Sequence, residues 1–171
     1  MYATSSPEPL KVNNRFAHLV TGTLNDPEKQ SLIALALAIL QEQHQPGQTL
    51  DSPSVTREYL RLRLADYPAE VFGCLFLDNQ HRILAVRELF TGTVDGAAVH
   101  PRVVVQQALG INAAALVFYH NHPSGVAEPS QADQAITRRL KEALALVDIR
   151  VLDHFVVTCE TSVSFAERDL L

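Results

Sequence analysis

The chain has 171 residues, of which 47% are hydrophobic, so it can form one domain with a single core and needs no disulfides to hold it together. Fourteen Lys and Arg stand against nineteen Asp and Glu, and the formal net charge of -5 has the wrong sign for a protein held to nucleic acid mainly by neutralising phosphates. Composition therefore gives nucleic-acid binding no support, although it does not exclude it.

The cysteines and the N-terminus indicate the compartment. Cys74 and Cys159 form no CxxC pair, which favours a reducing environment over a disulfide framework or a thiolate metal cage. The N-terminal residues lack the layout of a secretion signal, and no apolar run is long enough to cross a bilayer. We expect a cytoplasmic protein with no membrane partner.

The first third of the chain predicts a tail and two helices. Residues 1–25 mix Pro, Ser, Asn and Thr with few apolar side chains, which predicts a flexible N-terminal tail. Asp26 and Ser52 are each followed by proline, a pattern that predicts the N-cap and first residue of a helix, and the strongly apolar first helix should be buried. We expect residues 26–66 to form a helical segment packed on the core.

The remaining residues, 67–171, alternate between strand and helix patterns. A hairpin is predicted from two stretches rich in β-branched, aromatic and Leu residues, 70–78 and 81–90. Further strands are predicted at 114–121 and 148–158, and helices at 101–109 and 129–147. This alternation predicts an α/β domain with a mixed sheet flanked by helices.

Two histidines end the strand predicted at 114–121. His120 and His122 occupy positions i and i+2 of a strand, so both side chains point the same way and can reach one metal ion. Asp133 follows His122 by eleven residues, across a loop rich in proline and glycine. Two imidazoles and one carboxylate form the three-ligand set that holds a catalytic zinc ion and leaves one position for water.

Each member of this set also has a purely structural interpretation. Histidines at strand spacing can be satisfied polar groups, and Ser130 followed by Asp133 resembles a capping box at the start of a helix. The letters His-Asn-His are not the nuclease motif of that name, which spreads its residues over separate elements. Asn121 should point to the opposite face of the strand and be structural. The recurrence of His, His, Ser and Asp in one short segment favours a site.

The segment resembles a known family. The pattern H-x-H-P, continued by Ser130 and Asp133, resembles the signature of the JAMM (MPN-plus) metalloproteases, and Glu70 stands where that family has an upstream glutamate. The stretches ELFTGT, VHPRVVVQQALGINAAALVFYHNHPSG and VLDHFVV resemble the RadC family, historically labelled DNA repair proteins, in its short prophage-associated form. The resemblance covers residues from about 30 to 171 and implies a JAMM/MPN, cytidine-deaminase-like architecture for residues 67–171.

The resemblance also implies roles for individual residues. It implies that His120, His122 and Asp133 bind Zn²⁺. It implies further that Glu70 accepts a proton from the attacking water and passes it to a leaving amine, while Ser130 donates a hydrogen bond to the tetrahedral oxyanion. The implied function is a zinc metallopeptidase-like hydrolase that cleaves a peptide or isopeptide bond in a peptide or protein substrate.

Other polar residues receive smaller roles. Glu88 is a second choice for the base, since its flanks do not match the family's glutamate position. Asp153 and His154 are neighbours on a strand, so they point to opposite faces and cannot both serve one metal; a buried contact of the histidine with a carbonyl or a carboxylate is expected. Four histidines lack partners at ligand spacing and should be exposed: His18, His44, His81 and His100.

Rival functions remain at this point. The alternative is a DNA-repair-associated or mobile-element-associated accessory protein with a binding or catalytically idle metal site, although residues 1–65 show no helix-hairpin-helix module of the kind that longer relatives carry. A cytidine deaminase is disfavoured because its H-x-E and P-C-x-x-C patterns are missing. An iron oxygenase would not need Glu70 and Ser130, and the intact ligand set argues against a metal-free scaffold.

Overall fold

The computed structural model describes residues 20–42, 44–50, 53–64, 67–92 and 99–171. Most of the expected tail, residues 1–19, and the expected cap Ser52 lie outside the described residues. The chain divides into two compact units, Met1–Leu35 and Ala36–Leu171, and the sheet with every candidate site residue belongs to the second.

The first helix differs from expectation in its cap and in its burial. A short 3-10 helix, η2 (Thr21–Thr23), precedes α1 (Asp26–Glu42). Asn25 caps α1 in place of Asp26: Glu28 N donates to Asn25 Oδ1 at 3.0 Å, and Asn25 N donates to Glu28 Oε2 at 2.9 Å. None of the residues of α1 is buried, so the prediction of a buried helix was wrong.

A five-stranded mixed sheet forms the centre of the second unit and confirms the predicted fold class. Its strand order is β2-β1-β3-β4-β5, with β3 and β4 parallel and every other neighbouring pair antiparallel. The strands are β1 (Val71–Leu77), β2 (Ile83–Thr91), β3 (Ala115–Asn121), β4 (Arg150–Val157) and β5 (Ser162–Ser164). The three-residue β5 was not predicted.

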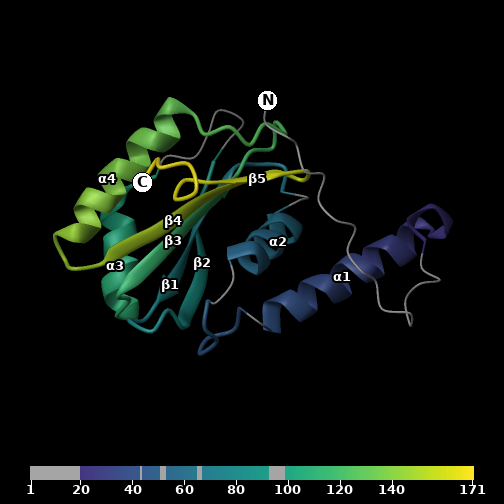
Figure 1. The fold of residues 1–171 in the computed structure, drawn as a ribbon, viewed down its shortest axis with the longest axis horizontal. Coiled ribbons are helices and arrows are strands. Elements are labelled where there is room, and N and C mark those ends of the chain that lie inside the picture. Colours follow the sequence, from purple (N-terminus) through teal and green to yellow (C-terminus); the bar gives the residue numbers. More distant parts are fainter. Residues whose placement is uncertain (1–19, 43, 51–52, 65–66, 93–98) are drawn as a thin grey trace, which may run out of the picture. The chain divides into compact units, whose positions relative to one another are not determined.

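Helices cover both faces of this sheet (Figure 1). One face packs against α2 (Pro53–Leu64), and the other against α3 (Pro101–Ile111) and α4 (Gln131–Ala145). Strand alternation produces the two cores, because side chains of odd number on β1 and β3, such as Tyr119, join the α2 side, while those of even number, such as Phe118, join the α3 and α4 side. His120 and His122 both carry even numbers, so they belong to the side of the sheet that α3 and α4 cover.

The connection from β3 through α4 to β4 places the candidate site. In an open α/β sheet, ligands bind beyond the carboxyl ends of the parallel strands, where the following helix begins. Here β3 ends at Asn121, β4 ends at Val157, and the loop from His122 leads to the start of α4. The backbone N–H of His122 donates to Val157 O at 2.9 Å, which fixes the first residue beyond β3 against the end of β4.

Candidate metal centre

The structure brings His120, His122 and Asp133 together at this edge of the sheet. The Nε2 atoms of the two histidines are 2.9 Å apart, and Asp133 Oδ1 lies 3.4 Å from His120 Nε2 while its Oδ2 lies 3.5 Å from His122 Nε2. The ligand atoms of the three residues all lie within 4.8 Å of one another. Across the described residues, this is the one group of three or more His, Cys, Asp or Glu side chains with such a geometry, and it could hold a metal ion.

The surrounding hydrogen bonds determine which nitrogen of His122 is free. His122 Nδ1 lies 2.7 Å from the carbonyl oxygen of Val126. A carbonyl oxygen only accepts, so Nδ1 carries the hydrogen and Nε2 of the neutral ring carries the lone pair. The Nε2 atom therefore faces Asp133 and His120 as a potential metal ligand, in the arrangement that metal-binding histidines usually have.

His120 is buried and is bonded to a second buried histidine. Its Nδ1 lies 2.8 Å from Nε2 of His154, which stands on β4. Burial lowers the pKa of His154 well below its ordinary value, so that ring is neutral. The other nitrogen of His154 lies 2.7 Å from Oγ1 of Thr137 on α4, which completes a chain of buried hydrogen bonds from the candidate ligand to the helix.

Opposite charges around Asp133 favour its ionised form. Burial raises the pKa of Asp133, but the hydrogen bonds that His120 and His122 donate when their rings are protonated outweigh this effect, and the net result is a pKa well below its usual value. The hydrogen bond with Asp133 raises the pKa of His122 against the effect of burial, and the charge of Glu70 raises it further. The centre thus combines a carboxylate with a second negative charge nearby, an environment that suits a cation.

Ser130 and Asp133 form a complete capping box at the start of α4. Asp133 N donates to Ser130 Oγ at 3.1 Å, and Ser130 N donates to Asp133 Oδ2 at 2.7 Å. The serine hydroxyl also donates to Asp133 Oδ2, at 2.6 Å. The structural interpretation of this pair therefore holds, and the same bonds orient a candidate ligand. The role of Ser130 as an oxyanion donor stays a prediction.

Glu70 lies immediately before β1, the strand that pairs with β3. The register pairs Phe72 with His120, so the residue two positions earlier lies toward His122. The side chain of Asn121 holds the backbone on both sides of Glu70, because its Oδ1 accepts from Val71 N at 2.7 Å and its Nδ2 donates to Ala69 O at 3.1 Å. The role of Glu70 as the base stays a prediction.

Glu88, the second choice for the base, lies elsewhere. It pairs with Gly73 across β1 and β2, on the side of the sheet opposite to His120. Its Oε1 accepts from Arg63 Nη2 at 2.8 Å, and the hydroxyl of Tyr67 lies 3.2 Å from each carboxylate oxygen. Glu88 therefore belongs to an ion pair on the α2 side.

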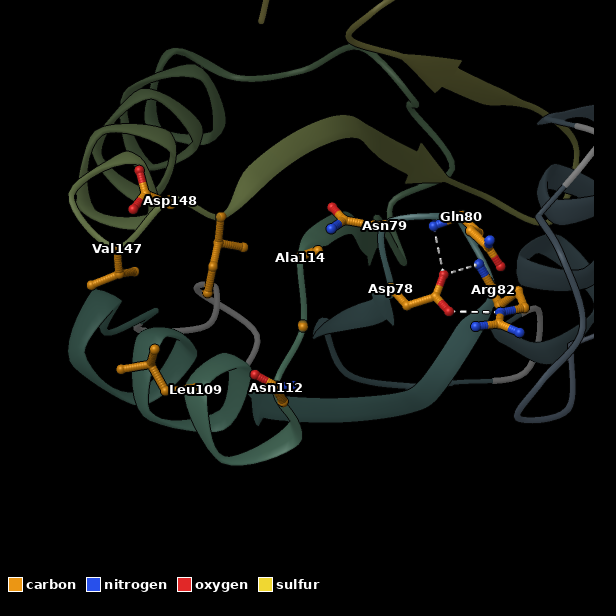
Figure 2. A pocket seen from close by; sticks show the side chains of 11 residues that line it. Asp78, Asn79, Gln80, Arg82, Leu109, Asn112, Ala114, Val147 and Asp148 are labelled. Carbon is orange, nitrogen blue, oxygen red and sulfur yellow. Dashed lines mark hydrogen bonds and ion pairs between the residues drawn. The ribbon is translucent and has the colours of Figure 1, made fainter.

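Other candidates are also placed by the structure. His44 is buried, contrary to expectation, and its ring stacks on Tyr59 with centroids 4.2 Å apart. A cavity of about 550 Å³ lies at the opposite end of the sheet, between the turn at Asp78 and the segments that precede β3 and β4. Figure 2 shows the side chains that line it. Asp78 accepts hydrogen bonds from the backbone of Gln80 and Arg82 and from Arg82 Nε, so its charge is satisfied within the turn.

Sequence reasoning missed the roles of His154 and Thr137. His154 was expected to make a buried contact with a carbonyl or a carboxylate; its burial is confirmed, but its partners are the ring of His120 and the hydroxyl of Thr137. The contact between His154 and His120 depends on the parallel register of β3 and β4. This register places His154 opposite Phe118, which lies two residues before His120 on β3. The alternation of β4 places His154 on one face of the sheet, but only the register, which pairs it with Phe118, shows that this is the face of His120.

The chain matches a family model described as a RadC-like JAB domain over residues 50–170. It is 59% identical over 150 residues to a UPF0758 protein of Thioalkalivibrio sulfidiphilus, covering 88% of this chain and 67% of that protein. It is 64% identical over 121 residues to one of Methylibium petroleiphilum, covering 71% of this chain and 54% of that protein.

A third relative is nearer in length. A UPF0758 protein of Vibrio cholerae is 59% identical over 136 residues, which cover 80% of this chain and 85% of that protein. The chain thus spans two thirds or less of some relatives and most of another. In the part of the chain that the structure describes, no helix has both the length and the apolar character needed to cross a membrane.

Proposed function

Because the chain belongs to the RadC family, we propose that it is a zinc-dependent hydrolase that cleaves a peptide or isopeptide bond by means of a metal-activated water. The observation that carries the proposal is the convergence of His120, His122 and Asp133. Two imidazoles and one carboxylate match the ligand set of catalytic zinc sites, which keep one coordination position for water or substrate.

The protonation pattern of the two histidines supports this assignment. Both Nδ1 atoms have hydrogen-bond partners in the protein, at Val126 O and at His154 Nε2. The two Nε2 atoms point at each other across 2.9 Å, an unfavourable arrangement for two lone pairs unless a cation or a proton lies between them. A zinc ion bound there would lower the pKa of a water molecule and polarise the scissile carbonyl.

Glu70 is the residue proposed to move protons. Its charge contributes to the raised pKa of His122, after the larger effect of the Asp133 hydrogen bond, and this contribution supports the proposal. A carboxylate in this place can take a proton from the attacking water and deliver it to the leaving amine. Asn121 restrains the backbone on both sides of Glu70 and so limits where that carboxylate can move.

Ser130 is proposed to donate a hydrogen bond to the oxyanion. Its hydroxyl hydrogen points at Asp133 Oδ2, so donation to the substrate requires the hydroxyl to turn away from that oxygen. Asp133 Oδ2 keeps the hydrogen bond from Ser130 N, so this turn does not leave the carboxylate without a donor. In hydrolases, loss of one oxyanion donor costs about 3 kcal/mol of transition-state stabilisation.

The proposal is tested with purified protein, metal analysis and a library of peptide and isopeptide substrates. We expect one zinc per chain and hydrolysis that stops on chelation and returns with zinc. The matched control is Glu70→Gln, which keeps the side-chain volume. This variant should bind zinc normally and lose turnover by about 100-fold or more.

Two outcomes would contradict the proposal. One is hydrolysis that survives both chelation and Glu70→Gln, which would place the activity outside this centre. The other is retention of a DNA oligonucleotide at physiological salt with no turnover of any peptide, which would support the accessory function in its place.

A further inference from the structure

A chain of three hydrogen bonds, two of them buried and the third partly buried, leads from the candidate metal centre to the body of α4. His120 Nδ1 lies 2.8 Å from His154 Nε2, and His154 Nδ1 lies 2.7 Å from Thr137 Oγ1. The same hydroxyl oxygen lies 2.5 Å from the carbonyl oxygen of Asp133. The side chains of His120, His154 and Thr137 are buried, so water does not compete for the two bonds that join them.

The direction of every proton in this chain follows from its end. The carbonyl oxygen of Asp133 only accepts, so the single hydroxyl hydrogen of Thr137 points to it. The hydroxyl oxygen must then accept from His154, which places the hydrogen of that neutral ring on Nδ1 and its lone pair on Nε2. That lone pair accepts from His120, whose hydrogen therefore stands on Nδ1.

The consequence for His120 is a fixed tautomer. With its hydrogen on Nδ1, the lone pair of His120 lies on Nε2, the atom that faces His122 and Asp133. We infer that His154 and Thr137 are positioning residues that hold His120 in its metal-binding tautomer and thereby set the affinity of the centre for a divalent cation. This inference rests on the proposed function, since it concerns the same metal centre.

A purely structural role for His154 makes different predictions. Its ring packs against the rings of Phe72, Phe118 and Phe165, with centroids 4.7 to 5.7 Å away, so a large substitution would disturb the core whatever the tautomer does. Thr137 provides the sharper test, because it takes part in the hydrogen-bond chain only through its hydroxyl, which bonds to His154 Nδ1 and to the carbonyl oxygen of Asp133. Removing only that hydroxyl therefore distinguishes a packing role of His154 from its role in orienting His120.

The central experiment compares Thr137→Val with Thr137→Ser. Valine keeps the shape and removes the hydroxyl, so Nδ1–H of His154 loses its acceptor and the opposite tautomer is no longer disfavoured. In that tautomer His154 donates from Nε2, and His120 must carry its hydrogen on the nitrogen that faces the metal position. Zinc affinity should fall about 10- to 100-fold in Thr137→Val, as for other outer partners of metal ligands, and should be retained in Thr137→Ser.

A second pair of variants tests His154 itself. Gln in place of His154 can present a carbonyl oxygen near the position of Nε2 and accept from His120, whereas Leu of similar volume cannot. We expect His154→Gln to bind zinc more tightly than His154→Leu by about 10-fold or more. Circular dichroism and thermal unfolding of the zinc-free variants identify any that fail to fold, and the Thr137 pair then decides the question.

The tautomers themselves can be observed without metal or substrate. Long-range proton–nitrogen NMR spectra of the histidine side chains distinguish the two neutral forms. The zinc-free protein should show His120 and His154 with hydrogen on Nδ1, and Thr137→Val should shift both rings toward the other form. Zinc affinity is measured in parallel by competition with a chromophoric chelator.

The outcomes separate this inference from the proposed function. Equal zinc affinity in wild type, Thr137→Val and Thr137→Ser would overturn the inference while leaving the metal centre intact. A wild-type protein that binds no zinc would overturn the proposed function. If the NMR spectra of the zinc-free wild type showed the hydrogen of His120 on Nε2, the proposed hydrogen-bond chain from His120 to Thr137 would be rejected by that measurement alone.

Discussion

The ring of Tyr119 fills the space in which a side chain on Gly73 would begin. The two residues are cross-strand partners on β1 and β3, and a Cβ atom built on Gly73 would overlap Cζ and the hydroxyl oxygen of Tyr119. Tyr119 is fully buried, so its ring has no route into solvent. Gly73 is therefore required by the packing of its partner rather than by an unusual backbone angle.

Gly73→Ala should destabilise the protein by more than the roughly 1–3 kcal/mol typical of an extra methyl group in a packed core. Urea unfolding measures the change. The control is Gly110→Ala on α3, where no atom lies within 4 Å of an added Cβ and alanine is the better helix former. That variant should be neutral or stabilised by up to about 1 kcal/mol, and equal losses in both variants would show that packing against Tyr119 is not the cause.

Asn121→Ala should weaken the strand end that carries Glu70. The substitution removes an acceptor from Val71 N and a donor from Ala69 O, which costs about 1–3 kcal/mol when such groups are buried. Asn79→Ala, at an exposed turn, is the control and should change the free energy of unfolding by less than about 0.5 kcal/mol.

The same Asn121→Ala variant separates Glu70 from the metal ligands. Asn121 points to the other face of β3 from His120, so zinc affinity measured by chelator competition should change little. Peptide turnover should fall, because Glu70 is less well placed. A large loss of zinc affinity with full stability would contradict this division of roles.

His122→Ala should abolish stoichiometric zinc binding. It removes an Nε2 atom 3.5 Å from Asp133 Oδ2 and leaves two of the three candidate ligands. Zinc at 100 times its Kd should stabilise the wild type by about 2.7 kcal/mol and the variant by nothing measurable, as read from thermal unfolding. His100→Ala, at an exposed position, is the control, and a full equivalent of tightly held zinc in His122→Ala would discard the site.

His44 should make stability fall as the pH is lowered. Burial lowers the pKa of His44 below its ordinary value of 6.5, and the hydrogen bond to Leu40 O opposes this only in part. The unfolded chain therefore binds the proton more readily than the native one, so the contribution of His44 is fully present above pH 6.5 and is lost as the pH falls toward the native pKa.

The measurement compares urea unfolding of wild type and His44→Gln at several pH values in the presence of a chelator. The difference between the two proteins isolates His44, because the raised pKa of His122 acts in the opposite direction and is common to both. The wild type should lose more stability than the variant between pH 8 and about pH 5. If the free energy of unfolding changed with pH by the same amount in both proteins, protonation of His44 would not be the cause.

The parts of the fold that follow local rules were predictable from the sequence. The alternation of apolar residues located β1, β3 and β4 to within one or two residues, and the proline and capping signals located α2, α3 and α4. The strand β5 was missed because three residues carry too short a pattern to alternate visibly. The cap of α1 was assigned one residue late because Asn25 and Asp26 are both good N-caps.

The parts that depend on register were not predictable in the same way. His120 and His154 are 34 positions apart, and their contact exists only because β3 and β4 pair in parallel with a particular offset. The burial of His44 likewise depends on how the residues after α1 pack against Tyr59 of α2. By contrast, the approach of Asp133 to the two histidines was predictable, because a short loop and a helix cap restrict where it can lie.

The cap at Ser130 ties the occupancy of the centre to the order of a helix end. Asp133 aims its carboxylate at the histidines only while the first turn of α4 is closed by the bonds from Ser130. Opening of that single turn would withdraw one of the three candidate ligands and leave the pairing of the strands untouched, so a cation bound there would be exchanged by local fraying of the helix, without global unfolding. Binding of a cation and opening of the first turn of α4 would then oppose each other in one equilibrium.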